Sequence, residues 1–403
     1  MAETQIVGAA RGGVLPRKAP LVALLAAVTA IGPFSLQALS PALPAISVGF
    51  EVRSEIAQLM LSLSLVAMAV TTLIWGPVSD RLGRRPVMMT GMLLAGAGSA
   101  LAALAPELWM AVLGRLMQAG GAVAGMVLAR AVAQDLYGRE SSAGVIGQIT
   151  AAMVIAPMIA PALSGVIVDF AGWRGVFALV AVAAIGLAVL VRAKLPETAP
   201  EAKRESPRAI LAGFGEIARN RAFWAHACFG ACSLAAFLFF VGSAPYVMEV
   251  AYQQRPSVYG FYFMPMAMTY MLANIACGRL TRRFGGHKMI VAGGTISIVC
   301  MVIGVGGMAS GLAGPLNLVV PALFHAIGAG FSVPNAVAGA VGAAPHRAGA
   351  ASGLLGFIQF MTAAVTTQIA GFLPHDVAMP ILIGMMILTA IGLSGYLLLE
   401  RRR

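Results

Sequence analysis

Arg115 is the one arginine that lies well inside an apolar segment of this chain, away from its ends, whereas none of the fifteen Asp and Glu residues lies in such a segment. An arginine in hydrocarbon costs about 2.5–3.5 kcal/mol, so we expect it to face a water-filled cavity or neighbouring polar groups. Gln118 lies one helical turn further on the same face and is its expected partner. The guanidinium would bind anionic or polar atoms of a ligand, or tune a nearby proton site. A structural arginine tied to backbone carbonyls is the alternative.

Two histidines, His226 and His325, are the titratable candidates within apolar stretches. Histidine changes charge near neutral pH, so either side chain could carry a proton. A packed, hydrogen-bonded histidine is the alternative for both. The four cysteines have neither His nor carboxylate beside them, so neither a metal site nor another cofactor is predicted.

The composition predicts the elements that position these residues. With 59% hydrophobic and 10% charged residues, the chain is unlike soluble globular proteins. Apolar stretches of about 20 residues or more, enough to span a bilayer as helix, recur throughout. They are continuously apolar rather than alternating, which predicts helices and not barrel strands. The predicted spans of this all-α membrane protein are 21–46, 57–76, 87–105, 108–130, 142–168, 173–192, 222–247, 257–279, 288–309, 315–340, 348–372 and 378–399.

The basic residues indicate an orientation. If the N-terminus is cytoplasmic, the loops on the opposite side hold only Arg53, Arg174 and Arg255 of the 27 Lys and Arg residues. This bias predicts a multi-pass protein of the bacterial inner membrane with both termini in the cytoplasm. The net charge of +12 then reflects topology and attraction to anionic lipid headgroups. No aromatic–basic module supports a nucleic-acid partner.

A charge-rich stretch and an internal repeat divide the chain into two halves. The sequence GPVSDRLG at residues 76–83 returns as GRLTRRFG at 278–285, an offset of 202 residues. A duplication that gives two parallel halves is typical of secondary transporters, with a substrate site between the halves. The predicted units are a cytoplasmic segment 1–19, six-helix bundles at 20–192 and 222–400, a cytoplasmic linker 193–221 and a basic tail 401–403.

The first copy of this repeat is the most specific motif of the chain. Its glycines permit a tight turn between two spans, and Asp80 could pair with nearby arginines or with a helix N-terminus. Such a polar latch suits a two-state gate. Arginines that serve only as positive-inside anchors are the alternative. The gating candidates here are Gly76, Asp80, Arg81, Gly83, Arg84 and Arg85.

These motifs resemble the major facilitator superfamily, most of all its bicyclomycin- and chloramphenicol-resistance (Bcr/CflA) branch of drug:proton antiporters. Residues 115–121 match the helix-4 arginine motif, and residues 130–136, with Arg130 and Asp135, match this branch's end of helix 4. Residues 156–165 resemble the helix-5 antiporter motif, and 334–335 and 345–349 also resemble this branch. The resemblance covers nearly the whole chain and implies two pseudo-symmetric six-helix bundles, drug efflux and no enzymatic activity.

Pro157 and Pro161 are spaced four residues apart, so they bend one helix along one face. Small residues around them, Gly165 among them, allow close helix approach. The resemblance implies that this bend seals the halves against ion leak, and a packing kink without a coupling role is the alternative.

Helix 1 departs from the branch. Members of the branch are similar to one another in having an Asp in helix 1, at the position where the present chain has Gln37. The side-chain amide of Gln37 does not titrate. Two mechanisms stay open: a proton-driven exporter that couples through a histidine, a helix-end acid or the substrate, and an uncoupled facilitator or exchanger for neutral or anionic molecules. We expect a monomer that binds a small molecule and, if coupled, protons. The pocket candidates are Gln37, Arg115, Gln118, Tyr246, Asn274, His325 and Gln359, with apolar walls from Phe34, Phe240 and Phe331.

Overall fold

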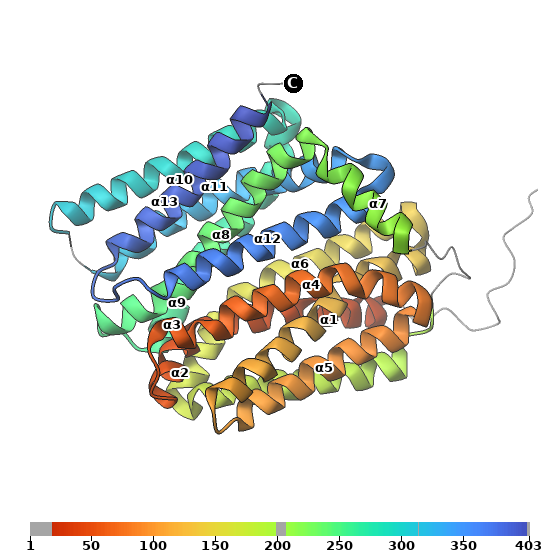
Figure 1. Cartoon of the computed structure of the whole chain (residues 1–403), viewed down its shortest axis with the longest axis horizontal. Coiled ribbons are helices and arrows are strands. Elements are labelled where there is room, and N and C mark those ends of the chain that lie inside the picture. Colours follow the sequence, from red (N-terminus) through yellow and green to blue (C-terminus); the bar gives the residue numbers. More distant parts are fainter. Residues whose placement is uncertain (1–17, 199–206, 313, 401–403) are drawn as a thin grey trace, which may run out of the picture.

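The computed structural model describes residues 18–198, 207–312 and 314–400, and every regular element within them is a helix (Figure 1). In chain order these are α1 Lys18–Ala38, η1 Ser40–Ala42, α2 Leu43–Gly49, α3 Ser54–Ala57, α4 Leu59–Leu82, α5 Arg84–Leu104, α6 Leu108–Lys194, α7 Pro207–Ala218, α8 Arg221–Val250, α9 Pro256–Phe284, α10 Gly286–Ala309, α11 Pro315–Gly342, η2 Pro345–Arg347, α12 Ala348–Ala370 and α13 Met379–Glu400.

The element α6 is three helices in succession. Gly138 and Gly172 have φ of 71° and 69°, a left-handed backbone at which an α-helix cannot continue. Ten described segments are long and apolar enough to cross a membrane. Gly172 divides the segment Gly144–Lys194 into two, and α9, with 29 residues, adds one more. The described chain therefore has the twelve spans that the sequence predicts, which confirms the all-α membrane fold.

The spans form two bundles that lie side by side (Figure 1). In the first bundle α1, α4 and α5 pack against α6, and in the second α8 packs against α11, α12 and α13 while α10 packs against α11. Because successive spans run in opposite directions, the connections gather at two ends. We call the end with residues 82–84, 195–198, 207–221 and 342–348 the termini end, and the end with residues 38–58, 250–256 and 370–379 the far end.

Small residues bring the helices of the first bundle into backbone contact. A side chain on Gly98 would overlap the carbonyl oxygen of Gly114, and one on Gly121 would overlap that of Gly91. Glycine is the residue that lets α5 and α6 approach this closely, and such contacts drive helix association where lipid removes the hydrophobic force.

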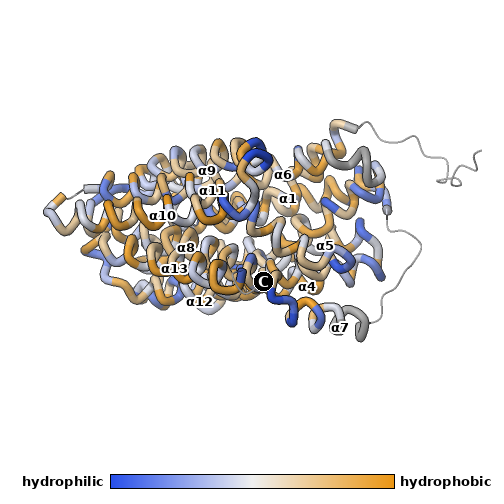
Figure 2. Tube along the Cα trace, turned by 90° about the horizontal axis from the view of Figure 1, so that it is seen from above, coloured by the Kyte–Doolittle hydropathy of each residue, from blue (hydrophilic) through white to orange (hydrophobic). Residues whose placement is uncertain are grey.

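Large apolar side chains lie exposed along the sides of the bundles. Val182 is 74% exposed, Ile303 67% and Ile275 61%. Figure 2 shows hydrophobic colouring along most of each helix, with hydrophilic residues gathered at helix ends, such as those near α5 and α7. This is the surface that a bundle embedded in a bilayer presents to lipid tails, and it agrees with the multi-pass membrane assignment.

The linker between the bundles contains a helix that the sequence analysis does not predict. α7 begins at Pro207 and ends at Ala218, inside the predicted linker 193–221. The ion pair between Arg347 Nε and Glu216 Oε2, 2.9 Å apart, ties α7 to η2. The linker is therefore attached to the second bundle at the termini end.

Candidate functional site

A cavity of about 1010 Å³ lies between the two bundles and reaches inward from the termini end. α4 and α6 line it on one side, and α11, η2 and α12 line it on the other, with Phe214 of α7 at its mouth. Small-molecule sites range over roughly 300–1,000 Å³, so the cavity has room for a drug-sized compound. Its inner wall includes Thr72, Gly76, Met126, Val127, Gln359 and Phe360.

The charged residues of the cavity are concentrated at its mouth and are mostly basic. Arg81, Arg130 and Arg347 line it together with His346, and Asp80 is the one acid among the described lining residues. Arg130 directs an amino group to the sulfur of Met153 at 3.6 Å, and Arg347 pairs with Glu216 outside the lining. The mouth therefore favours anionic or neutral compounds over cations on electrostatic grounds.

The loop between α4 and α5 carries an ion-pair network centred on Arg84. Arg84 Nη1 lies 2.6 Å from Asp80 Oδ1, and Arg84 Nε lies 3.2 Å from Asp135 Oδ2 on α6. Arg84 Nη1 also donates to Ser79 Oγ at 2.5 Å. The Asp80–arginine contact expected from the sequence is present, and Asp135 joins it to a second helix of the same bundle. A gating role for this network remains a prediction.

Glu197, which the sequence analysis leaves as an ordinary linker residue, completes this loop. Its carboxylate accepts hydrogen bonds from the backbone amides of Arg84, at 2.8 Å, and of Arg85, at 3.2 Å. It thereby caps the N-terminus of α5, where the helix dipole favours a negative charge. The position could not be found from spacing, because Glu197 follows Arg84 by 113 residues.

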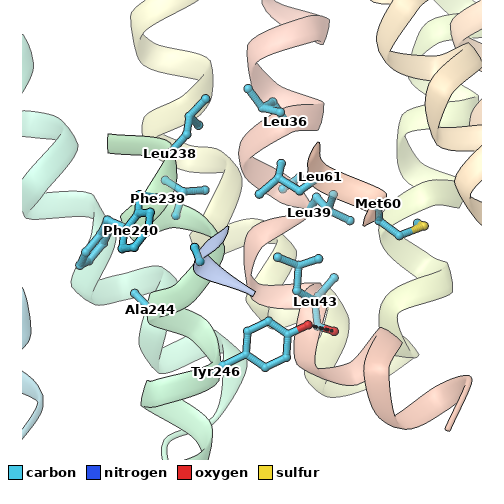
Figure 3. Close-up of a cluster of buried hydrophobic side chains, with 14 of the residues drawn as sticks. Leu36, Leu39, Leu43, Met60, Leu61, Leu238, Phe239, Phe240, Ala244 and Tyr246 are labelled. Carbon is cyan, nitrogen blue, oxygen red and sulfur yellow. Dashed lines mark hydrogen bonds between the residues drawn. The ribbon is translucent and has the colours of Figure 1, made fainter. Parts of the chain in front are cut away.

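The far end is closed by neutral contacts between the bundles. The core there combines Leu39, Leu43 and Leu61 of the first bundle with Leu238 and Phe240 of the second (Figure 3). Hydrogen bonds cross this seam from Ser40 Oγ to the Val241 carbonyl at 2.5 Å, from Gln58 Nε2 to the Thr367 carbonyl at 3.1 Å, from Ser62 Oγ to Gln368 Oε1 at 2.6 Å and from the Tyr246 hydroxyl to the Leu43 carbonyl at 3.3 Å. We call this set of contacts the far seal.

The proline-containing part of α6 also belongs to the contact between the bundles. A side chain on Gly165 would overlap the carbonyl oxygen of Pro256 at the start of α9. One on Gly260 would overlap the carbonyl oxygen of Pro161. Pro157 is half-buried nearer the termini end. The small residues around the bend therefore sit where one bundle touches the other; whether the bend prevents ion leak stays a prediction.

Arg115 is buried, and its predicted partner is confirmed. Its Nη1 donates to Gln118 Oε1, while its Nε and Nη2 have no partner among the described residues. α1 runs antiparallel to this part of α6, and a Cβ on Gly32 would lie 3.6 Å from the Ala122 carbonyl oxygen, so Gln37 lies at a depth similar to that of Arg115. The Oε1 of Gln37 is likewise buried without a partner. All three side chains lie outside the cavity lining, and their binding role stays a prediction.

The candidates of the second bundle are distributed over several sites. Gln359 lines the cavity and donates to the Gly230 carbonyl at 3.3 Å. His325 is 3% exposed, and neither ring nitrogen has a partner within the described chain. His226 is half-buried, with Nδ1 2.9 Å from the Ala222 carbonyl oxygen. Asn274 and Phe331 are half-buried on α9 and α11.

The remaining pocket candidates lie in the packed core in this conformation. Phe240 and Tyr246 are 3% and 4% exposed and belong to the far seal. Phe34 is half-buried and packs against buried residues of the first bundle. None of these three lines the cavity that opens at the termini end. The structure thus brings Gln359 to the cavity and keeps the predicted aromatic walls away from it.

Comparison with known proteins gives a family match over most of the chain. A sequence profile described as the Major Facilitator Superfamily matches residues 25–367. The chain is 26% identical to Multidrug resistance protein D of Escherichia coli, covering 89% of this chain and 90% of that protein. It is 25% identical to a Bicyclomycin resistance protein homolog of Haemophilus influenzae, covering 94% and 95%. It is 27% identical to a Chloramphenicol resistance protein of Pseudomonas aeruginosa, covering 92% and 90%.

Solved structures share the fold at low sequence identity. A bacterial homolog of the human lysosomal transporter Spinster, in an inward-facing and unoccupied conformation, gives a TM-score of 0.80 at 14% identity and covers 96% of this chain and 98% of that one. A D-xylose–proton symporter gives 0.74 at 13% identity, covering 94% and 96%. These likenesses concern the arrangement of the helices alone.

Proposed function

Because the chain belongs to the Major Facilitator Superfamily and to its bicyclomycin- and chloramphenicol-resistance branch, we propose that this transporter exports antibiotics and other small molecules across the bacterial inner membrane by alternating access. The observation that carries the proposal is the cavity of about 1010 Å³ between the bundles, open at the termini end and closed by the far seal. Three relatives are named for resistance to multiple drugs, to bicyclomycin and to chloramphenicol, and these names supply the substrate class.

The proposed orientation places the termini end in the cytoplasm. Arginines gather at this end, Arg81, Arg84 and Arg85 among them, and membrane loops rich in Lys and Arg stay on the cytoplasmic side. The cavity then receives substrates from the cytoplasm or the inner leaflet. Export requires residues 20–192 to rock against residues 222–400, so that the far seal parts and the mouth closes. We expect this cycle in a monomer.

Proton antiport is part of the proposal. The candidate proton carriers are His325 and His226, since Gln37 stands where the branch has an acid. A second candidate function is an uncoupled facilitator or exchanger of neutral or anionic molecules. The basic mouth of the cavity favours this alternative, because Arg81 and Arg130 face it while Asp80 is the one acid that lines it in the described part of the chain.

Resistance profiling tests the export proposal. An efflux-deficient bacterial host expressing the protein should tolerate neutral and anionic antibiotics at raised concentrations, and cationic ones less so. Arg115→Ala should lower that resistance by roughly tenfold, equivalent to about 1.4 kcal/mol of lost interaction. Arg219→Ala is the matched control, because Arg219 is exposed beside the linker helix. A host that gains resistance to none of these compounds would refute antibiotic export.

Proton flux separates the two mechanisms. Purified protein in liposomes should release or take up protons when a transported compound is added, as followed with a pH-sensitive dye. His325→Ala should abolish this flux while His226→Ala keeps it, if His325 carries the proton. Substrate movement without any proton flux would favour the facilitator, and Gln37→Asp is then expected to create coupling by restoring a titratable group.

A further inference from the structure

His375 occupies an unusual place in the far seal. It lies in the connection between α12 and α13, and its ring stacks on that of Tyr246 with centroids 4.7 Å apart and planes inclined by 15°. The Tyr246 hydroxyl in turn donates to the Leu43 carbonyl of the first bundle at 3.3 Å (Figure 3). His375 therefore touches a residue that holds the two bundles together.

The same connection rests directly on the first bundle. Ser54 Oγ donates to the Gly371 carbonyl at 3.2 Å, and Gln368 Nε2 donates to the Glu55 carbonyl at 2.8 Å. A side chain on Gly371 would lie 3.0 Å from the Cα of Glu55. Any parting of the bundles at the far end must break these contacts and admit water to His375.

Both ring nitrogens of His375 are buried, and neither has a hydrogen-bond partner within the described chain. A neutral imidazole leaves one N–H unsatisfied in this position, whereas an imidazolium would leave two and bury a charge as well. Stacking on Tyr246 offsets part of that cost through cation–π attraction, but it replaces neither hydrogen bond. The closed far seal accordingly disfavours the protonated ring.

The negative charges around His375 favour the protonated ring, but they offset the effect of burial only in part. Glu55 of α3 and Asp376 of the same connection lie near the ring, and Glu249 of α8 lies near Tyr246. Glu55 is engaged with Arg53, 3.0 Å away, and no described carboxylate forms an ion pair with His375. Burial lowers the pKa of His375 below its ordinary value, and the negative charges of Glu55 and Asp376 counteract this only in part.

We propose that His375 is a proton-binding site of the far seal, and that a proton taken up from the far side holds the seal open. A group that binds protons less well in the closed conformation than in the open one favours closure at high pH. The closed form loses that advantage as the pH falls through the ordinary range of histidine, about 6.5. Acidity on the far side thus shifts the protein toward the conformation that faces that side.

The physiological direction of this effect rests on the proposed function and orientation. If the far side is the periplasm, a proton at His375 favours the conformation in which an exporter releases its substrate. Proton binding here also requires no acid at membrane depth, in keeping with Gln37 in helix 1.

Spin-label distances at the far end test the proposal without any transported compound. Cysteines at Val48 of α2 and at Leu312 beyond α10, which are 73% and 60% exposed, would carry the labels after the four native cysteines are replaced by alanine. The population with a widened far end should rise by roughly threefold or more as the pH falls from about 8 to about 5. No change over this range, or widening as the pH rises, would overturn the proposal.

Variants at position 375 assign the effect to this ring. His375→Phe keeps a flat ring against Tyr246 and cannot bind a proton, so its far end should stay closed at every pH. His375→Gln, a smaller polar replacement, should be equally insensitive and guards against misfolding of the Phe variant. His287→Gln is the matched control, because His287 is exposed at the start of α10 and lies outside the cavity lining, and it should retain the wild-type response.

A wild-type pH response in both position-375 variants would exclude His375 as the site. Failure of antibiotic export with an intact His375-dependent response would contradict only the proposed function. Export together with a pH-independent far end would contradict only the present inference.

Discussion

Two loops at the termini end have the same backbone conformation but different side-chain interactions. Gly83, between α4 and α5, has φ 100° and ψ 151°, and Gly285, between α9 and α10, has φ 83° and ψ 152°. The two glycines are 202 residues apart, at equivalent places of the internal repeat. This backbone region is open essentially to glycine alone. The shared turn therefore explains why both copies of the motif end in glycine.

The side chains of the two loops form different interactions. In the first, Arg84 bridges Asp80 and Asp135, and Glu197 caps α5. In the second, Arg282 occupies the place of Asp80 and Gly286 that of Arg84. There Thr281 Oγ1 donates to Asn335 Oδ1 at 3.1 Å, and Asn335 Nδ2 donates to Cys277 Sγ at 3.1 Å.

The difference between the two loops distinguishes the requirements of the fold from those of the proposed transport cycle. Either loop turns the chain between two spans, so the turn itself does not require charge. The charged version lies on the cavity mouth, which Asp80 and Arg81 line, whereas residues 278–285 do not line the cavity. We infer that the ion pairs of the first loop serve the opening and closing of the mouth.

The first prediction compares the two glycines and carries the largest expected effect. Gly83→Ala and Gly285→Ala should each destabilise the protein by about 1–3 kcal/mol, because both force a side chain into a glycine-only backbone region. Gly83→Ala should cost more, since its Cβ would lie 2.6 Å from Glu197 Oε2, whereas a Cβ on Gly285 meets nothing within 4 Å. Thermal unfolding of the two purified variants measures the difference. Equal losses would mean that Glu197 contributes nothing to the first loop.

The second prediction concerns the central arginine of the charged loop. Arg84→Ala should lower transport by about tenfold and stability by about 1–2 kcal/mol, because Asp80 and Asp135 both lose their partner. Arg282→Ala is the matched control in the second loop, where the guanidinium Nε donates to the Gly278 carbonyl at 3.3 Å and, among the described residues, makes no ion pair. Uptake into inverted vesicles, normalised to expression, reports both. Equal transport by the two variants would end the functional contrast between the loops.

The third prediction concerns the negative charge of Glu197 at the start of α5. Glu197→Gln keeps an oxygen that accepts from one backbone amide but removes the negative charge at the start of α5. The expected loss is about 0.5–1 kcal/mol, the usual value of a charge at a helix end. The loss should shrink in high salt, because the interaction lies at the surface. A salt-independent loss would point to packing rather than to charge.

Sequence patterns predict the features of this protein that depend on local spacing. Apolar stretches of span length indicate the helices, and the separation of three residues predicts the Arg115–Gln118 contact. The short helices η1 and α2 are not resolved from α1 in this way, since the whole stretch Ala19–Gly49 is apolar. Hydropathy reports burial in lipid and carries little information on where one helix ends and the next begins.

Contacts between the two bundles could not be predicted from local sequence patterns. Gln58 bonds to Thr367 across 309 residues, and Ser40 to Val241 across 201, and no periodicity links the members of either pair. These contacts depend on how the two bundles pack against each other, and the proposed transport cycle changes that packing. The same holds for Phe240, whose type suits a pocket wall but which this conformation places in the far seal.

The fourth prediction has the smallest expected effect and tests whether any charge at the termini end matters equally. Arg347 of η2 pairs with Glu216 of α7, with side chains 37% and 70% exposed. Exposed ion pairs contribute about 0–1 kcal/mol and weaken in salt, so Glu216→Gln should shift stability by less than about 0.5 kcal/mol. Transport should stay near the wild-type level, unlike that of Arg84→Ala. Thermal unfolding and vesicle uptake of the two variants, measured side by side, make the comparison. A loss of transport in Glu216→Gln as large as that in Arg84→Ala would show that the second bundle also gates the mouth by charge, through its linker helix rather than through its repeat loop.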